Sequence, residues 1–165
     1  MSQYHLIVNL DKREFLDPRE LGEGLQACEL ISSAVGPAQA LAALLLCSNG
    51  RGGGDLEERA DADVLIGRWA GDRIAVVGGY AEDADLPGQS DPAASKIFEM
   101  CRQGDWRDIA ALLRPLLAHE LGVEFIPEEQ RVRYLDGRVD RYTVWQVQRD
   151  PDAAYSVLDI GEAGS

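Results

Sequence analysis

The stretch YHLIVN, from Tyr4 to Asn9, is a short apolar run bounded by polar residues, which predicts a buried β-strand. Further along, DVLIGRWAGDRIAVVGGYA, residues 63–81, contains two more apolar runs. We expect strands at Val64–Trp69 and Arg73–Val77, joined by a tight turn at residues 70–72. These strands predict a sheet at the centre of the fold.

Stretches with the apolar spacing of helices lie between and after these strands. Asp17 and Pro18 suit the cap and the first position of a helix that runs to about residue 32. The sequence predicts three more helices: one over residues 38–49, one that opens at Asp91–Pro92, and one that Asp105 caps. Pro115 is expected to kink or split the last of these helices, and Gly122 to end it.

The C-terminal part of the chain predicts a β-hairpin. Val123–Ile126 has the composition of a strand, and Arg131–Leu135 and Arg138–Val147 flank Asp136 and Gly137, a strong hairpin-turn signal. The predicted class is therefore α+β, with an antiparallel or mixed sheet and helices packed on one face. We expect a single globular domain over residues 1–160 and a frayed tail at residues 161–165.

Composition argues against several classes of protein. The chain has 165 residues, a hydrophobic fraction of 45% and a net charge of −13, which suits one globular domain and opposes direct binding to nucleic acid. No apolar run is long enough to span a bilayer, so no membrane contact is expected. Cys28, Cys47 and Cys101 are widely spaced and form no CxxC motif, which predicts reduced thiols in a cytoplasmic protein.

Much of the negative charge falls in two short runs. Their acidic residues are Glu57, Glu58, Asp61, Asp63, Glu82, Asp83 and Asp85. Two interpretations stay open. The runs are solvated loops, or they form an acidic surface that binds a protein partner with a basic surface.

The glycine-rich stretch SNGRGGGDL, residues 48–56, does not match the known phosphate-binding loops. A P-loop needs Lys and then Ser or Thr after its last glycine, but Asp55 and Leu56 stand there. A dinucleotide-binding loop follows a strand, whereas a helix is predicted before this loop. The remaining alternatives are an anion-binding nest of backbone amides with Arg51 beside it, or a simple connector.

Signals for catalysis or metal binding are weak. His5 and His119 are the only histidines, and the chain has no HExxH, GxSxG or EF-hand pattern. We therefore predict no catalytic residue, no metal and no cofactor. Asp72 and Arg73 beside Trp69 are candidates for binding a polar ligand. The alternative is a hairpin turn with a local contact between Asp72 and Arg73.

Three segments, VNLDKREFLDP, NGRGGGDL and GRWAGDRIAVVGGYA, together resemble a family of small bacterial and phage-associated proteins. The resemblance covers residues 4–81 and implies no established activity. Gly79 stands where we associate an acidic residue with that family, in Gly-Asp-Tyr-Ala. The resemblance selects as ligand-binding candidates Arg51, Asp55, Trp69, Asp72, Arg73 and Tyr80.

Three functional hypotheses follow. The first is a non-enzymatic, cytoplasmic, acidic binding protein, such as an immunity protein or a phage-encoded inhibitor of a basic or nucleic-acid-binding protein. The second is a small-molecule-binding protein or enzyme, with its site where the glycine-rich loop meets the WAGDR segment. The third is an accessory component of a bacterial or phage assembly.

Overall fold

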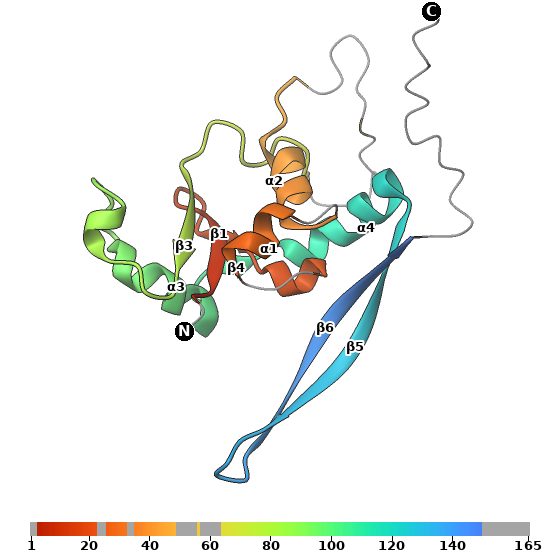
Figure 1. Cartoon of the computed structure of the whole chain (residues 1–165). Helices are drawn as coiled ribbons and strands as arrows, with labels where there is room; N and C mark the ends of the chain where they lie inside the picture. Colours follow the sequence, from red (N-terminus) through yellow and green to blue (C-terminus); the bar gives the residue numbers. More distant parts are fainter. Residues whose placement is uncertain (1–2, 23–25, 33–34, 49–55, 57–63, 150–165) are drawn as a thin grey trace, which may run out of the picture.

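A computed structural model describes residues 3–22, 26–32, 35–48, 56 and 64–149 of the chain. These residues form a four-stranded sheet with helices packed against it and a separate two-stranded ribbon (Figure 1). The predicted α+β class is confirmed.

The central sheet is built around the first apolar run of the sequence. Its strands are β1 (His5–Asn9), β2 (Glu14–Leu16), β3 (Ile74–Gly78) and β4 (Arg107–Asp108). They lie in the order β3-β1-β2-β4, so β1 has a neighbour on each side. Because β1 runs antiparallel to β2 and β3 while β2 runs parallel to β4, the sheet is mixed.

Helices cover both faces of this sheet, and not the one face that was expected. The helical segments are η1 (Pro18–Leu21), α1 (Ala27–Ser32), α2 (Pro37–Leu45), η2 (Asp83–Asp85), α3 (Ala94–Gln103) and α4 (Ala110–Leu121). Ile7 of β1 packs in one core cluster with α2 and α4, whereas Leu6 and Val8 pack in another with α3. Successive residues of a strand point to opposite faces, and here all three are apolar. Both faces therefore need a cover.

The predicted strand at Val64–Trp69 is wrong, because this segment forms a series of turns. Two of its backbone N–H groups bond the end of α2: the Gly67 N–H donates to the Ala43 carbonyl (2.9 Å) and the Trp69 N–H donates to the Leu44 carbonyl (2.8 Å). Leu65 and Trp69 are buried in the same core cluster as α2. These two apolar residues are therefore buried against the end of α2. Strand β3 confirms the second predicted strand.

Two helix boundaries also differ from the prediction. The helix expected over residues 17–32 stops after η1, where Gly22 takes a left-handed conformation with φ +82°, and α1 is a separate short helix. Asp105 caps no helix, because the chain first forms β4 beside β2. The helix α4 then begins with the Ala110 N–H donating to Asp108 Oδ1 (2.9 Å). It continues through Pro115 without the split that was one of the expectations, and it ends at Gly122 as predicted.

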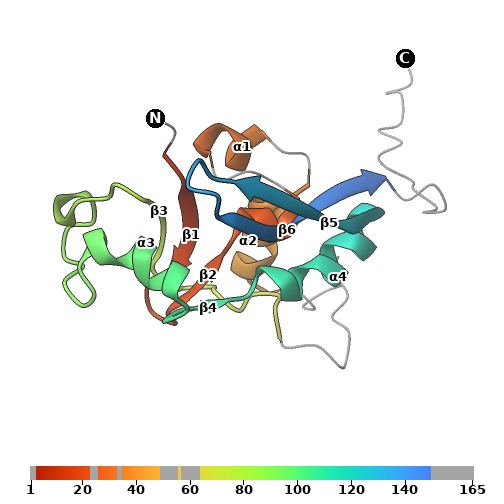
Figure 2. The same cartoon turned by 90° about the horizontal axis from the view of Figure 1, so that it is seen from below.

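The predicted hairpin is confirmed and is longer than expected. Strands β5 (Val123–Arg133) and β6 (Val139–Arg149) pair antiparallel over their whole length. We call residues 123–149 the arm. The far end of the arm stands clear of the helices and the central sheet (Figure 1). Figure 2 looks from that end toward the body of the molecule, with α4 beside the arm.

Candidate functional site

Two of the sequence motifs that carried the family resemblance bind each other. The Asn9 amide donates to Asp72 Oδ2 (2.8 Å), and Lys12 forms an ion pair with the same carboxylate. Arg73 donates from its backbone N–H (2.7 Å) and from Nε (2.8 Å) to Asp11. Asn9 also accepts the backbone N–H groups of Asp11 and Lys12, at 3.0 and 2.8 Å. These bonds fasten the turn between β1 and β2 to the start of β3.

A second polar group lies deeper in the same region. Glu14 on β2 is buried, and it accepts the indole N–H of Trp69 at 2.8 Å and a bidentate pair of hydrogen bonds from Arg68. Burial raises the pKa of Glu14, but the hydrogen bonds from Arg68 and Trp69 outweigh it and hold the pKa below its usual value. Glu14 is therefore ionised at neutral pH, and the Arg68 guanidinium neutralises its charge inside the protein.

The structure thus places three of the six ligand-binding candidates in internal contacts. Trp69 is fully buried, and Asp72 and Arg73 are bonded to the β1–β2 turn. Tyr80 follows β3 and is exposed. Arg51 and Asp55 lie outside the described residues. The sequence interpretation missed Asn9, Glu14 and Arg68, although opposite charges in DKRE (residues 11–14) and RWAGDR (residues 68–73) were the signal that could have paired them.

The described residues include one of the two predicted acidic runs, and its acidic side chains are exposed. Glu82, Asp83 and Asp85 lie in or beside the short helix η2. Asp85 accepts the Glu82 N–H (2.8 Å), and Asp83 accepts the Ser95 N–H at the start of α3 (3.1 Å). These bonds orient the carboxylates while leaving them open to solvent, and those from Ser95 lower the pKa of Asp83. The other run, Glu57, Glu58, Asp61 and Asp63, lies outside the described residues.

The root of the arm is clamped to the body by one arginine. The Arg114 guanidinium on α4 lies 3.7 Å from the ring centroid of Trp145 on β6. Its Nη1 donates to the Glu20 carboxylate (2.6 Å) and to the Glu20 carbonyl (3.0 Å). Phe125 of β5 packs against the core cluster beneath. One cation therefore joins η1, α4 and the arm.

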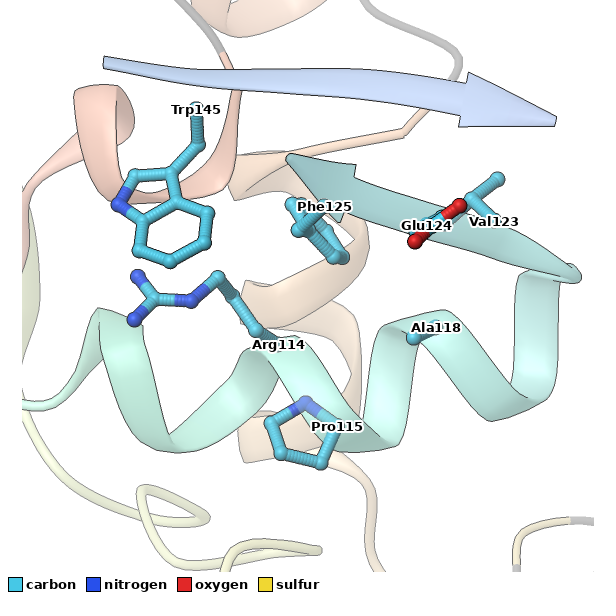
Figure 3. Close-up of a pocket in the computed structure, with 7 residues that line it drawn as sticks. All are labelled: Arg114, Pro115, Ala118, Val123, Glu124, Phe125 and Trp145. Atoms are coloured by element: carbon cyan, nitrogen blue, oxygen red, sulfur yellow. The ribbon is translucent and has the colours of Figure 1, made fainter. Parts of the chain in front are cut away.

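Beside this clamp is an open hollow of about 520 Å³ (Figure 3). Its lining residues are Arg114, Pro115, Ala118, Val123, Glu124, Phe125 and Trp145. Figure 3 shows Trp145 and Phe125 directed from the arm toward α4. The hollow is therefore walled by the arm on one side and by α4 on the other.

The far end of the arm carries large side chains that contribute nothing to the core. Leu135 is completely exposed, and Tyr134, Val139 and Tyr142 are also exposed. In antiparallel pairing, residues that lie directly opposite share a face. Arg131 lies opposite Arg141, and Arg133 lies two residues further along the same face. Like charges directly opposite destabilise a ribbon. Arg131 is compensated in part by Glu129, whose Oε1 accepts a hydrogen bond from Arg131 Nε (2.9 Å).

A second hollow, of about 230 Å³, lies between the sheet and α3. Its lining residues are Leu6, Phe15, Asp17, Arg19, Phe98, Cys101 and Arg102. Arg19 is already paired with Asp17, with Nη2 and Oδ2 2.6 Å apart. Of the two arginines in the lining, one is therefore neutralised within the protein.

The three cysteines are expected to differ in reactivity. Cys28 and Cys47 are exposed, whereas Cys101 is buried, and burial raises the pKa of Cys101 to about 12. Because the thiolate is the reactive form, an aromatic disulfide reagent at mildly alkaline pH should modify Cys28 and Cys47 in the native protein and Cys101 only after denaturation. Peptide mass spectrometry of the modified protein measures this. Labelling of native Cys101 as fast as Cys28 would contradict the packing of α3.

Comparison with protein-family models, with curated proteins and with solved structures finds no match to this chain. The family resemblance of residues 4–81 therefore stays a prediction. In the part of the chain that the structure describes, no helix combines the length and the apolar character needed to cross a bilayer. Among those same residues, no three His, Cys, Asp or Glu side chains gather as ligands for a metal ion.

Proposed function

We propose that this chain is a non-enzymatic, cytoplasmic binding protein whose acidic surface docks on a basic surface of a protein partner. The observation that carries the proposal is the exposed, oriented set of carboxylates at Glu82, Asp83 and Asp85. Carboxylates that are already held in place lose little freedom when a partner binds. The net charge of −13 would draw a basic partner toward this surface.

A partner of this kind is a basic or nucleic-acid-binding protein, as in an immunity protein or a phage-encoded inhibitor. An acidic surface competes with phosphate groups for the same arginine and lysine side chains. The polar groups of Asp72, Arg73 and Trp69 are engaged within the chain, which favours binding through the surface over a small-molecule site at the WAGDR segment.

The test is capture of the partner from a lysate of the source cells, followed by kinetic measurement with the purified partner. We expect one basic protein, released as the salt concentration rises. Glu82→Gln combined with Asp85→Asn removes two charges but keeps side chains that accept hydrogen bonds. This variant should lower the association rate about tenfold and flatten its salt dependence.

The matched control is Glu124→Gln combined with Glu128→Gln, which changes the net charge equally but on the arm. This control should keep most of the association rate. Equal loss in both variants would mean that net charge alone acts, and no loss in either would contradict a docking surface at η2.

A further inference from the structure

We propose that the arm is a dimerisation element, in which the outer edge of β5 pairs antiparallel with β5 of a second copy of this chain. This inference goes beyond the proposed function, because it concerns the arm and needs no other partner. It rests on the direction of the backbone groups, on the charges along β5, and on the hollow at the root of the arm.

The backbone groups that face outward from β5 can be identified. The Tyr134 N–H donates to the Arg138 carbonyl (2.8 Å), so this pair is hydrogen-bonded. Hydrogen-bonded and non-hydrogen-bonded pairs alternate along an antiparallel ladder. The odd-numbered residues Glu129, Arg131 and Arg133 are therefore non-hydrogen-bonded within the arm, and their N–H and C=O groups point to the outer edge. Pro127, which has no N–H, falls in the same outward-facing class, as a proline in a strand requires.

This edge is open along the far part of the arm. Within the described residues, β5 is paired only with β6. A two-stranded ribbon is marginally stable by itself, and an unpaired edge is a template for another strand. A second strand would therefore stabilise the arm.

The charges on β5 favour a second copy of β5 as its pairing partner, and they favour one register between the two strands. Glu129 and Arg131 already form an ion pair within one chain, with Arg131 Nε 2.9 Å from Glu129 Oε1. A two-fold axis beside Gln130 sets two such pairs side by side in opposite order, with Glu129 of each copy opposite Arg131 of the other, at positions where both residues can exchange backbone hydrogen bonds. An axis beside Glu129 would oppose two glutamates, and an axis beside Val132 would oppose Arg131 and Arg133. An axis beside Arg131 would oppose two arginines. The register centred on Gln130 is the one in which every charged pair next to the axis is complementary.

The hollow at the root fits the same register. In this register the turn that follows β5 of the second copy, which carries Leu135, lies toward Phe125, and Phe125 lines the hollow together with Pro115 and Ala118. Leu135 is completely exposed in the single chain. The exposed Leu135 side chain would thus lie near the apolar lining residues Phe125, Pro115 and Ala118. The contact would occur twice, because a two-fold axis relates the two arms.

The first experiment measures the mass of the purified chain by light scattering and sedimentation over a range of concentrations. We expect a dimer that dissociates on dilution. Glu129→Arg and Arg131→Glu each create two like-charge contacts across the axis, and each should raise the dimer dissociation constant about tenfold or more. The combined Glu129→Arg and Arg131→Glu variant restores opposite charges and should restore the dimer. Circular dichroism melts confirm that all variants fold.

The second experiment tests the register by cross-linking. In a background with Cys28→Ser and Cys47→Ser, Gln130→Cys places two thiols across the axis, where the Cα atoms of a non-hydrogen-bonded pair are about 4.5 Å apart. This distance suits a disulfide. Glu128→Cys is the matched control, because it would lie roughly 13 Å from its counterpart. We expect oxidation to cross-link the first variant and not the second.

Several results would overturn the proposal. These are a monomer at every concentration, a dimer that both single charge reversals leave unchanged, a double reversal that fails to restore it, or equal cross-linking at residues 128 and 130. A monomer that binds duplex DNA, and loses that binding on Arg131→Glu, would also overturn it and assign the arginines of the arm to nucleic acid instead.

Discussion

Replacing Glu14 with alanine is expected to lower the free energy of unfolding by about 3–5 kcal/mol, the cost of removing one partner from a buried ion pair. The change leaves the Arg68 guanidinium and the Trp69 indole N–H without the carboxylate that they bond. A domain of this size is stable by roughly 5–15 kcal/mol, so the variant should be near the limit of folding. Urea denaturation followed by circular dichroism measures the loss.

The same carboxylate predicts a dependence of stability on pH. The folded-state pKa of Glu14 is lowered, so its ionised form is favoured by folding. Its stabilising effect is present above the unfolded pKa of about 4.3 and is lost as the pH falls through the lower folded value. We expect the wild-type protein to lose stability in this acid range more steeply than Glu14→Gln.

The control is Glu99→Ala on α3, which is exposed and accepts a hydrogen bond from the Gln103 side chain (2.8 Å). Its cost should stay within about 0.5 kcal/mol, as for most surface changes. A loss of stability at Glu14 as small as the loss at Glu99 would contradict the prediction that the buried Glu14 carboxylate stabilises the folded protein.

Replacing Gly22 with alanine is the second large effect and should free the root of the arm. Gly22 has φ +82°, and a Cβ at this position would lie 2.2 Å from Val147 Cγ2 and 3.2 Å from the Trp145 carbonyl oxygen. The left-handed conformation costs about 1 kcal/mol for alanine, and the overlap with β6 adds roughly 1–3 kcal/mol. Rotation of the Val147 side chain would relieve the contact with Cγ2, but the Trp145 carbonyl oxygen is backbone. Full relief therefore requires the arm to move away from η1.

Limited proteolysis measures this displacement. Trypsin should cut at the arginines of the arm faster in Gly22→Ala than in the wild-type protein, while the rest of the chain stays intact. Gly104→Ala is the matched control. Gly104 also ends a helical segment with a left-handed φ of +85°, but a Cβ there meets nothing within 4 Å. Equal proteolysis of the two variants would show that backbone strain alone, and not contact with Val147, accounts for the effect.

Local sequence signals predicted most of the secondary structure. YHLIVN forms β1, the turn signal at Asp136 and Gly137 closes the arm, and Gly122 ends α4. Each of these depends on the conformational preference or burial of a few neighbouring residues, which are visible in the chain itself. The hairpin is longer than predicted, because β5 continues from Val123 through Pro127 to Arg133, and the outer edge of a ribbon tolerates a proline.

The errors arose where a distant segment decides the outcome. Val64–Trp69 has the composition of a strand, yet the N–H groups of Gly67 and Trp69 bond carbonyls at the end of α2, which sequence spacing does not show. The same reason applies to the ligand-binding candidates. Asp72 and Arg73 look like residues available for a ligand until the fold brings Asn9, Lys12 and Asp11 to them.

The sequence by itself determined the α+β class, the apolar strand at the centre and the excess of negative charge. Only the tertiary structure decided which polar groups satisfy each other inside the protein and which stay exposed. The buried charge of Glu14 is paired by Arg68, which is far away along the chain. Whether the edge of a ribbon is open depends on which other segments lie beside it in the fold. For this reason the acidic residues at η2 could be named from the sequence, whereas the Arg114 clamp, the hollow and the open edge of β5 could not.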